Sequence, residues 1–126
     1  MPFVVLIMLL ILVEYIVFMM LCGKARASSG LQAPAVTGDE HFERAYRVQM
    51  NTLEQMVITL PAMWICANYF MTMVAAVLGL AFIIGRIMYR TAYMKDPTAR
   101  GPGMLVGFFA NIGLIGCGLW GVISQL

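Results

Sequence analysis

Two short stretches of the chain place arginine, asparagine, glutamate and tyrosine at helical spacing. At about 100° per residue, each set of polar side chains falls on one face of a helix. The two sets are Arg44, Arg47, Asn51 and Glu54, and Arg86, Tyr89, Arg90 and Tyr93. Arginine binds carboxylates through a planar fork of N–H donors. Because arginines outnumber acids here, the pattern predicts a small anionic ligand, and Glu54 suits a ligand that also carries an ammonium group.

Internal ion pairing is the alternative use of these charges. Glu43 and Arg47 are spaced i,i+4 on one helix, and Glu54 could neutralise Arg86 across a helical hairpin. Such pairing would still leave positive charge over, because the two faces and their flanking loops hold more arginines than acids. A bound anion therefore remains the favoured interpretation.

The composition excludes a soluble enzyme. Of the 126 residues, 62% are hydrophobic and 11% are charged, whereas a soluble domain carries about 25% charged residues. A chain this short cannot bury so much apolar surface, and disordered chains are poor in hydrophobic residues. The three cysteines, Cys22, Cys66 and Cys117, lie far apart and show no metal-binding spacing. An integral membrane protein without a metal site is expected, and no basic domain for nucleic acid is present.

Four helical membrane spans account for the hydrophobic stretches, since each span needs about 20 residues. The uncharged stretch from Gln55 to Gly85 is too long for one span and too short for two. A hairpin turning near residues 68–72 resolves this, and it places Glu54 and Arg86 within the depth of the bilayer. The predicted spans are 3–22, 43–68, 72–94 and 103–124. The expected fold is an all-α integral membrane bundle of four transmembrane helices, in a single domain of residues 1–126.

The charges also predict an orientation. All eight lysines and arginines fall at one end of this topology, around the irregular first loop at residues 25–41 and the short third loop. The positive-inside rule places both loops in the cytoplasm and both termini on the opposite side. The brevity of the chain and the absence of a retention tail favour a bacterial inner membrane over the endoplasmic reticulum.

The polar helices carry a recognisable pattern. Residues 42–54 contain Arg-x-x-Arg-x-x-x-Asn-x-x-Glu, and residues 85–93 contain Gly-Arg-x-x-Tyr-x-x-x-Tyr, with Arg100 seven residues further on. Both closely resemble signatures of the MAPEG family, the membrane-associated proteins of eicosanoid and glutathione metabolism. The resemblance covers essentially the whole chain.

This resemblance implies a homotrimer that binds glutathione, as co-substrate, between neighbouring subunits and acts as a membrane-bound glutathione transferase. Arg100 matches the family arginine that stabilises the glutathione thiolate, and Tyr93 would assist as a hydroxyl donor. The second substrate would be a lipophilic electrophile from the bilayer, with conjugation or peroxide reduction as the reaction. Gln55 and Ala27 differ from the eicosanoid-synthesising branch and favour a general transferase. The implied glutathione site consists of Arg26, Arg47, Gln49, Asn51, Glu54, Arg86, Tyr89 and Tyr93.

Two other functions fit parts of the sequence. A non-catalytic member that binds lipid or glutathione would have no need of the full set of signature residues. A small multidrug antiporter exchanging cations for protons would use Glu14, the acid midway along the first span. Arginines at membrane depth would repel its cationic substrate, so the transferase is favoured over both.

Overall fold

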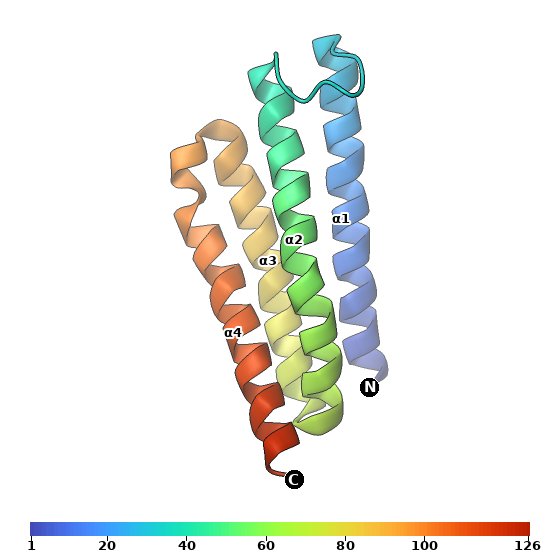
Figure 1. Cartoon of the computed structure of the whole chain (residues 1–126), viewed down its shortest axis with the longest axis vertical. Helices are drawn as coiled ribbons and strands as arrows, with labels where there is room; N and C mark the ends of the chain where they lie inside the picture. The colour runs from blue at the N-terminus through green and yellow to red at the C-terminus, as the bar shows by residue number, and fades with distance from the viewer.

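The computed structural model describes residues 1–126 and consists of four long helices joined by short connections. The helices run up and down, so that both termini lie at one end and the α1–α2 loop lies at the other (Figure 1). Their bounds are α1 Pro2–Ser29, α2 Glu40–Tyr69, α3 Thr72–Lys95 and α4 Gly101–Ile123, with the 3-10 helix η1 Pro97–Arg100 before α4. Each predicted span corresponds to one helix, and the four-helix membrane fold is confirmed.

Local signals explain most of the helix ends. The Asp39 side chain caps α2, its Oδ2 accepting from the Phe42 N–H at 2.9 Å. The N–H groups of Phe70 and Met71 both donate to the Cys66 carbonyl and close α2. The turn into α3 therefore lies where the hairpin was predicted.

The end of α1 differs from the prediction. Residues 25–29, expected to be irregular, continue the helix as far as Ser29. The helix stops at Gly30, which adopts the left-handed conformation with φ of 76° and donates its N–H to the Arg26 carbonyl. Glycine reaches this conformation without steric cost. The loop is consequently shorter than predicted, and Arg26 stands on the last turn of a helix.

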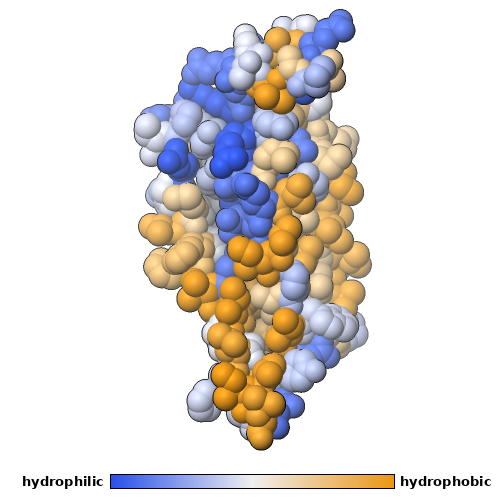
Figure 2. Space-filling model, in the orientation of Figure 1, coloured by the Kyte–Doolittle hydropathy of each residue, from blue (hydrophilic) through white to orange (hydrophobic).

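Three of the four helical segments are long and apolar enough to cross a membrane: α1, α3 and the segment Pro97–Ile123 that contains η1 and α4. The remaining helix, α2, is more polar, and it packs against all three of the others. Figure 2 shows the hydrophilic surface gathered in one half of the molecule and hydrophobic surface over much of the rest. Only 30 of the 126 residues are buried, so large apolar side chains on the outside face lipid. The chain is an integral, multi-pass membrane protein.

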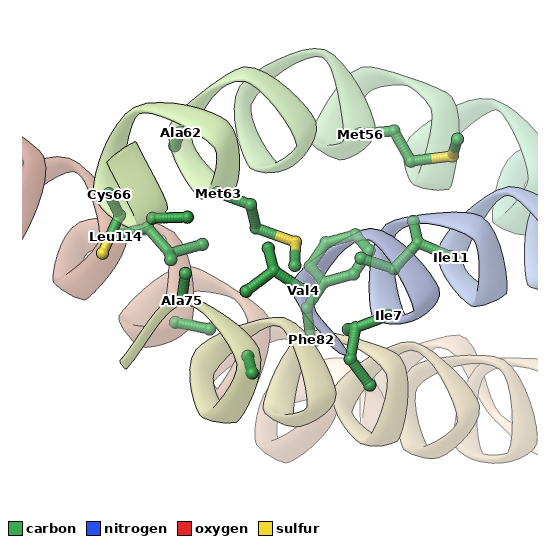
Figure 3. Packing of buried hydrophobic residues seen from close by; sticks show 13 residues of the cluster. Val4, Ile7, Ile11, Met56, Ala62, Met63, Cys66, Ala75, Phe82 and Leu114 are labelled. Carbon is green, nitrogen blue, oxygen red and sulfur yellow. The ribbon is translucent and has the colours of Figure 1, made fainter. Parts of the chain in front are cut away.

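An apolar core holds the bundle together in the half nearer the termini. Val4, Ile7 and Ile11 of α1 pack with Met63 of α2 and Phe82 of α3, as Figure 3 shows. All five side chains are at most 3% exposed. This packing fixes the spacing of the helices in that half, while the other half combines two smaller apolar clusters with polar side chains.

Glycine allows α4 to touch α3 directly at the polar end. A Cβ built on Gly103 would lie 2.4 Å from the backbone nitrogen of Tyr89 and 2.9 Å from the carbonyl oxygen of Gly85. Real Cβ atoms do not approach backbone so closely, hence only glycine fits. The start of α4 is thereby held against the turn of α3 that carries Tyr89.

Candidate functional site

A cavity of about 270 Å³ lies among α2, α3 and the start of α4 in the polar half of the bundle. Five side chains predicted from the sequence as glutathione-binding or catalytic share its wall, together with one methionine from α4. The lining residues are Arg47, Asn51, Tyr89, Tyr93, Arg100 and Met104. We call this space the site cavity.

The ion pairs differ from those considered for the sequence. Glu54 Oε1 lies 3.7 Å from Arg47 Nη1, two turns away on the same helix, and both side chains are more than half exposed. Glu54 therefore does not neutralise Arg86. The Glu43 carboxylate accepts from the Gly38 N–H at 3.0 Å instead of pairing with Arg47. Equal depth in the membrane places two residues at one level but does not set the direction in which each points.

Arg44, the first arginine of the motif, has partners outside the site cavity. Arg44 forms an ion pair with Glu40 and donates to the carbonyl oxygens of Met94 and Lys95 at 3.0 and 3.1 Å. It thus joins the start of α2 to the end of α3, beside the site cavity.

Arg86 lies behind the wall of the site cavity, not in it. Its side chain is 1% exposed, and its Nε and Nη2 donate to Thr52 Oγ1 at 3.2 and 2.9 Å. Nη2 also donates to Asn51 Oδ1 at 2.8 Å, and the guanidinium carbon lies 4.2 Å from the centre of the Tyr89 ring. Arg86 therefore orients two of the residues that line the cavity. The sequence interpretation did not include Thr52, although a threonine within a membrane helix can signal such an interhelical contact.

Two tyrosines form one side of the site cavity. The rings of Tyr89 and Tyr93, one turn apart on α3, stack with centroids 5.4 Å apart and planes 18° apart. Tyr89 is buried, whereas Tyr93 also lines a second cavity of about 410 Å³ together with Arg47. Four of the eight residues that line this second cavity are charged, and three of them, Glu40, Glu43 and Arg44, lie at the loop end of α2. A polar ligand therefore has a charged space next to the site cavity.

Arg100 is carried into the site cavity by η1. The Arg100 Nη1 donates to the Pro97 carbonyl at 3.3 Å, and the Asp96 carboxylate accepts from the Thr98 N–H at 3.1 Å and from the Thr98 hydroxyl at 2.9 Å. Proline at the first position and this aspartate cap start the 3-10 turn. The side chain of Arg100 remains exposed within reach of Tyr93 and Arg47.

The Asp96 cap on η1 predicts how the stability of this turn depends on pH. The Thr98 backbone N–H, followed by the Thr98 hydroxyl, lowers the pKa of the Asp96 carboxyl below its usual 3.8. Because the folded-state pKa lies below the unfolded one, this stabilisation is present at neutral pH and is lost as pH falls through the folded pKa. An NMR titration of the Asp96 carboxyl carbon should give a midpoint below 3.8. A midpoint at or above that value would contradict the capping geometry.

Two predicted site residues lie on the other side of α2, toward α1. The Arg26 Nη1 donates to the Ala35 carbonyl at 2.8 Å, and its guanidinium carbon lies 4.4 Å from the centre of the Phe42 ring. Gln49 Nε2 donates to the Tyr15 hydroxyl at 3.3 Å. Neither side chain lines the site cavity of its own chain.

A third cavity, of about 330 Å³, adjoins the site cavity through Met104 and continues along α4, with Leu105 and Phe108 in its wall. Gln55 and Arg86 also line it, and the side-chain oxygen of Gln55 accepts from Asn111 Nδ2 at 3.1 Å. The sequence interpretation did not include Asn111, although it stands out as an amide within an otherwise apolar helix. Across the chain, no group of three or more His, Cys, Asp or Glu side chains is placed to hold a metal ion.

Residues 4–120, nearly the whole chain, match the model of the MAPEG family. The chain belongs to the MAPEG family. The resemblance inferred from residues 42–54 and 85–100 is thereby confirmed. The arginines, tyrosines and asparagine of the site cavity are the residues by which that resemblance was recognised.

Individual relatives place this MAPEG protein near glutathione-related membrane proteins. It is 39% identical over 112 residues to an uncharacterized protein of Synechocystis, covering 89% of this chain and 82% of the other. It is 35% identical over 98 residues to human microsomal glutathione S-transferase 2, covering 78% of this chain and 64% of the human one. Guinea-pig leukotriene C4 synthase is 32% identical over 77 residues, covering 61% of this chain and 51% of the synthase. The chain thus spans about half to two thirds of the length of these two named relatives.

Proposed function

We propose that this MAPEG protein is a membrane-bound glutathione transferase that activates the glutathione thiol as a thiolate in the site cavity. The observation that carries the proposal is the meeting of Arg47, Asn51, Tyr89, Tyr93 and Arg100 around one space. These residues come from α2, α3 and the η1–α4 junction, at the polar end of a membrane bundle. The family membership and the likeness to microsomal glutathione S-transferase 2 support the choice of glutathione as the ligand.

The charges of the site match those of glutathione, which has two carboxylates, one ammonium and a thiol. Arg47 offers a bidentate fork for a carboxylate, and its exposed ion pair with Glu54, at 3.7 Å, is loose enough to open. Glu54 is then free to hold the ammonium group, and the Asn51 amide can bind the peptide. The second, charged cavity gives the polar part of glutathione room next to Arg47 and Tyr93.

Arg26 and Gln49 support the proposal of a homotrimer. Both belong to the glutathione set implied by the family pattern, yet both side chains lie on the α1 side of α2, away from their own site cavity. In a homotrimer with glutathione between subunits, these two residues would contribute to the site of the neighbouring copy. We therefore include the trimer, and the single domain of residues 1–126, in the proposal.

The chemistry requires the thiol to lose its proton. A thiol with a pKa near 8.5 is only a few per cent thiolate at pH 7, and lowering that pKa by about two units needs roughly 2.7 kcal/mol. The guanidinium of Arg100 and the hydroxyl of Tyr93 would supply this stabilisation at the partly desolvated edge of the bundle. The proton leaves to water, the sulfur forms a bond to the electrophilic carbon, and the leaving group departs with its electron pair. The same thiolate can reduce a hydroperoxide to an alcohol and water, with a second glutathione completing the disulfide.

The lipophilic substrate would reach the thiolate from the bilayer along the third cavity, whose Met104, Leu105 and Phe108 are apolar. We also propose that the basic end faces the cytoplasm of a bacterial cell, following the positive-inside rule. Both termini would then lie on the opposite side of the inner membrane.

Glutathione should stabilise the detergent-solubilised protein against heat. At a ligand concentration 100 times the dissociation constant, binding to the folded state contributes about 2.7 kcal/mol. A melting curve with and without glutathione measures this shift, and S-methylglutathione, which cannot form a thiolate, separates binding from activation. Conjugation of an aryl chloride then distinguishes the transferase from a non-catalytic binder, which would show the melting shift alone. Absence of any shift at millimolar glutathione would contradict the proposal.

A further inference from the structure

Glu14 lies near the middle of α1, within the membrane, and the proposed mechanism gives it no task. Both of its carboxylate oxygens are buried and have no hydrogen-bond partner. A carboxylate in such a place is costly unless a counter-charge compensates it. The position of Glu14 therefore requires a cationic neighbour.

Arg86 has the complementary need. Its guanidinium is almost fully buried, yet its hydrogen bonds go to neutral oxygens of Thr52 and Asn51. Neutral acceptors satisfy the N–H groups but leave the positive charge without a counter-ion. The guanidinium therefore requires an acid from another part of the bundle.

The other acids of the chain are engaged elsewhere. Glu54 pairs with Arg47 and Glu40 with Arg44, while the remaining three acids bind backbone N–H groups at the ends of helices or in the first loop. These three are Asp39, Glu43 and Asp96. Glu14 is the acid that remains, and its carboxylate oxygens accept no hydrogen bond from Arg86 or from any other donor of the chain.

The packing of α1 against α3 puts the two residues on facing sides of these helices. Ile11 and Phe82 belong to one buried cluster and point into the bundle interior in Figure 3. Glu14 follows Ile11 by three residues and Arg86 follows Phe82 by four, so each shares the helix face of the core residue before it. The interior faces of α1 and α3 therefore carry Glu14 and Arg86 toward each other.

We propose that Glu14 is the counter-ion of Arg86 and a positioning residue for the glutathione site. Arg86 connects it to the site, since Arg86 holds Asn51 by a 2.8 Å hydrogen bond and lies against the Tyr89 ring. Both of those residues line the site cavity. Without Glu14, the unpaired guanidinium turns toward water and withdraws its support from Asn51 and Tyr89. The positioning role rests on the proposed function, because it concerns glutathione binding. The ion pair does not depend on the proposed function.

A double-mutant cycle of Glu14→Gln and Arg86→Gln tests the pair. Each single change leaves one buried charge unpaired and should lower the melting temperature of the glutathione-free protein. The double variant removes both charges and should melt higher than either single variant. Glu14→Asp keeps the charge and should restore most of the stability, and Val13→Ala, on the lipid-exposed side of α1, is the matched control. Additive losses, or a double variant that folds no better than the singles, would overturn the pairing.

Glutathione affinity tests the positioning role separately. Glu14→Gln should weaken glutathione binding at least tenfold, whereas adding Glu14→Gln to Arg86→Gln should weaken it no further, because Glu14 acts through Arg86. The stability cycle can show that the two residues are coupled while the folded Glu14→Gln variant still binds glutathione as tightly as wild type. That combination would overturn the positioning role. If wild type binds no glutathione, the proposed function fails and the stability cycle still decides the ion pair.

Discussion

Replacing Arg100 with alanine should lower the rate of glutathione conjugation by about 25-fold at pH 7, by about 75-fold at pH 6 and by nearly 100-fold at about pH 5. These factors apply where Arg100 supplies the whole shift, so that the pKa of the bound thiol returns from near 6.5 to near 8.5. Any share supplied by the Tyr93 hydroxyl makes them smaller. Above about pH 9 both enzymes hold the thiolate, so their rates should converge. A pH–rate profile of kcat/KM for both proteins measures the change in the apparent pKa of the thiol.

Two comparisons make the Arg100 experiment specific. Lys95→Ala removes a positive charge at the same end of the bundle, from a side chain that does not line the site cavity, and should leave the profile unchanged. Arg100→Lys keeps the charge without the planar fork and should fall between wild type and alanine. If Arg100→Ala keeps the wild-type profile, thiolate stabilisation belongs to another group on the cavity wall, and the Tyr93 hydroxyl is the next to remove.

Replacing Gly103 with alanine should strongly destabilise the bundle through packing alone. The added Cβ would lie 2.4 Å from the Tyr89 nitrogen and 2.7 Å from the Tyr89 Cα, and backbone cannot move aside as a flexible side chain can. Overpacking of this kind costs about 1–3 kcal/mol, and contact with backbone places the expected loss near 3 kcal/mol. Because α4 carries Met104 and follows directly on Arg100, its displacement should also weaken glutathione binding more than tenfold.

Gly101→Ala is the matched control for the packing argument. It lies two residues earlier in the same helix, and nothing stands within 4 Å of an added Cβ. Alanine favours a helix over glycine by up to about 1 kcal/mol, so this variant should be as stable as wild type or slightly more stable. Equal melting temperatures for the two glycine variants would refute the close approach of α4 to Tyr89.

The sequence predicted the part of the site that follows from helical spacing within one element. Arg47 and Asn51 are one turn apart on α2, as are Tyr89 and Tyr93 on α3, so each pair must share a face wherever the helix lies. The long uncharged stretch also placed the hairpin turn correctly and thereby brought the two faces to the same depth. Family resemblance supplied Arg100, whose place in the site depends on η1 rather than on a periodic pattern.

Spacing within one helix does not show in which direction each face points in the bundle. Glu54 and Arg86 lie at similar depth, but Glu54 points to the exposed side with Arg47 while Arg86 points into the interior toward Thr52. The rotation of one helix about its axis is set by packing among all four helices. The contact of Gly103 with α3 and the apolar core are part of that packing. The same limit explains why the sequence suggested an arginine of another helix as the partner of Glu14 without assigning it, since the proposed partner, Arg86, lies far along the chain.

The ultraviolet absorbance of the glutathione thiolate is the most direct test of the central claim, that this MAPEG protein activates glutathione. Glutathione is added to the detergent-purified wild-type protein at neutral pH, and S-methylglutathione provides the baseline. The account predicts a thiolate band that saturates with glutathione, falls to about a quarter of the full band at pH 6 and disappears below about pH 5. The contradicting result is a melting temperature that shows glutathione binding together with no thiolate band at neutral pH, since glutathione would then bind without being activated.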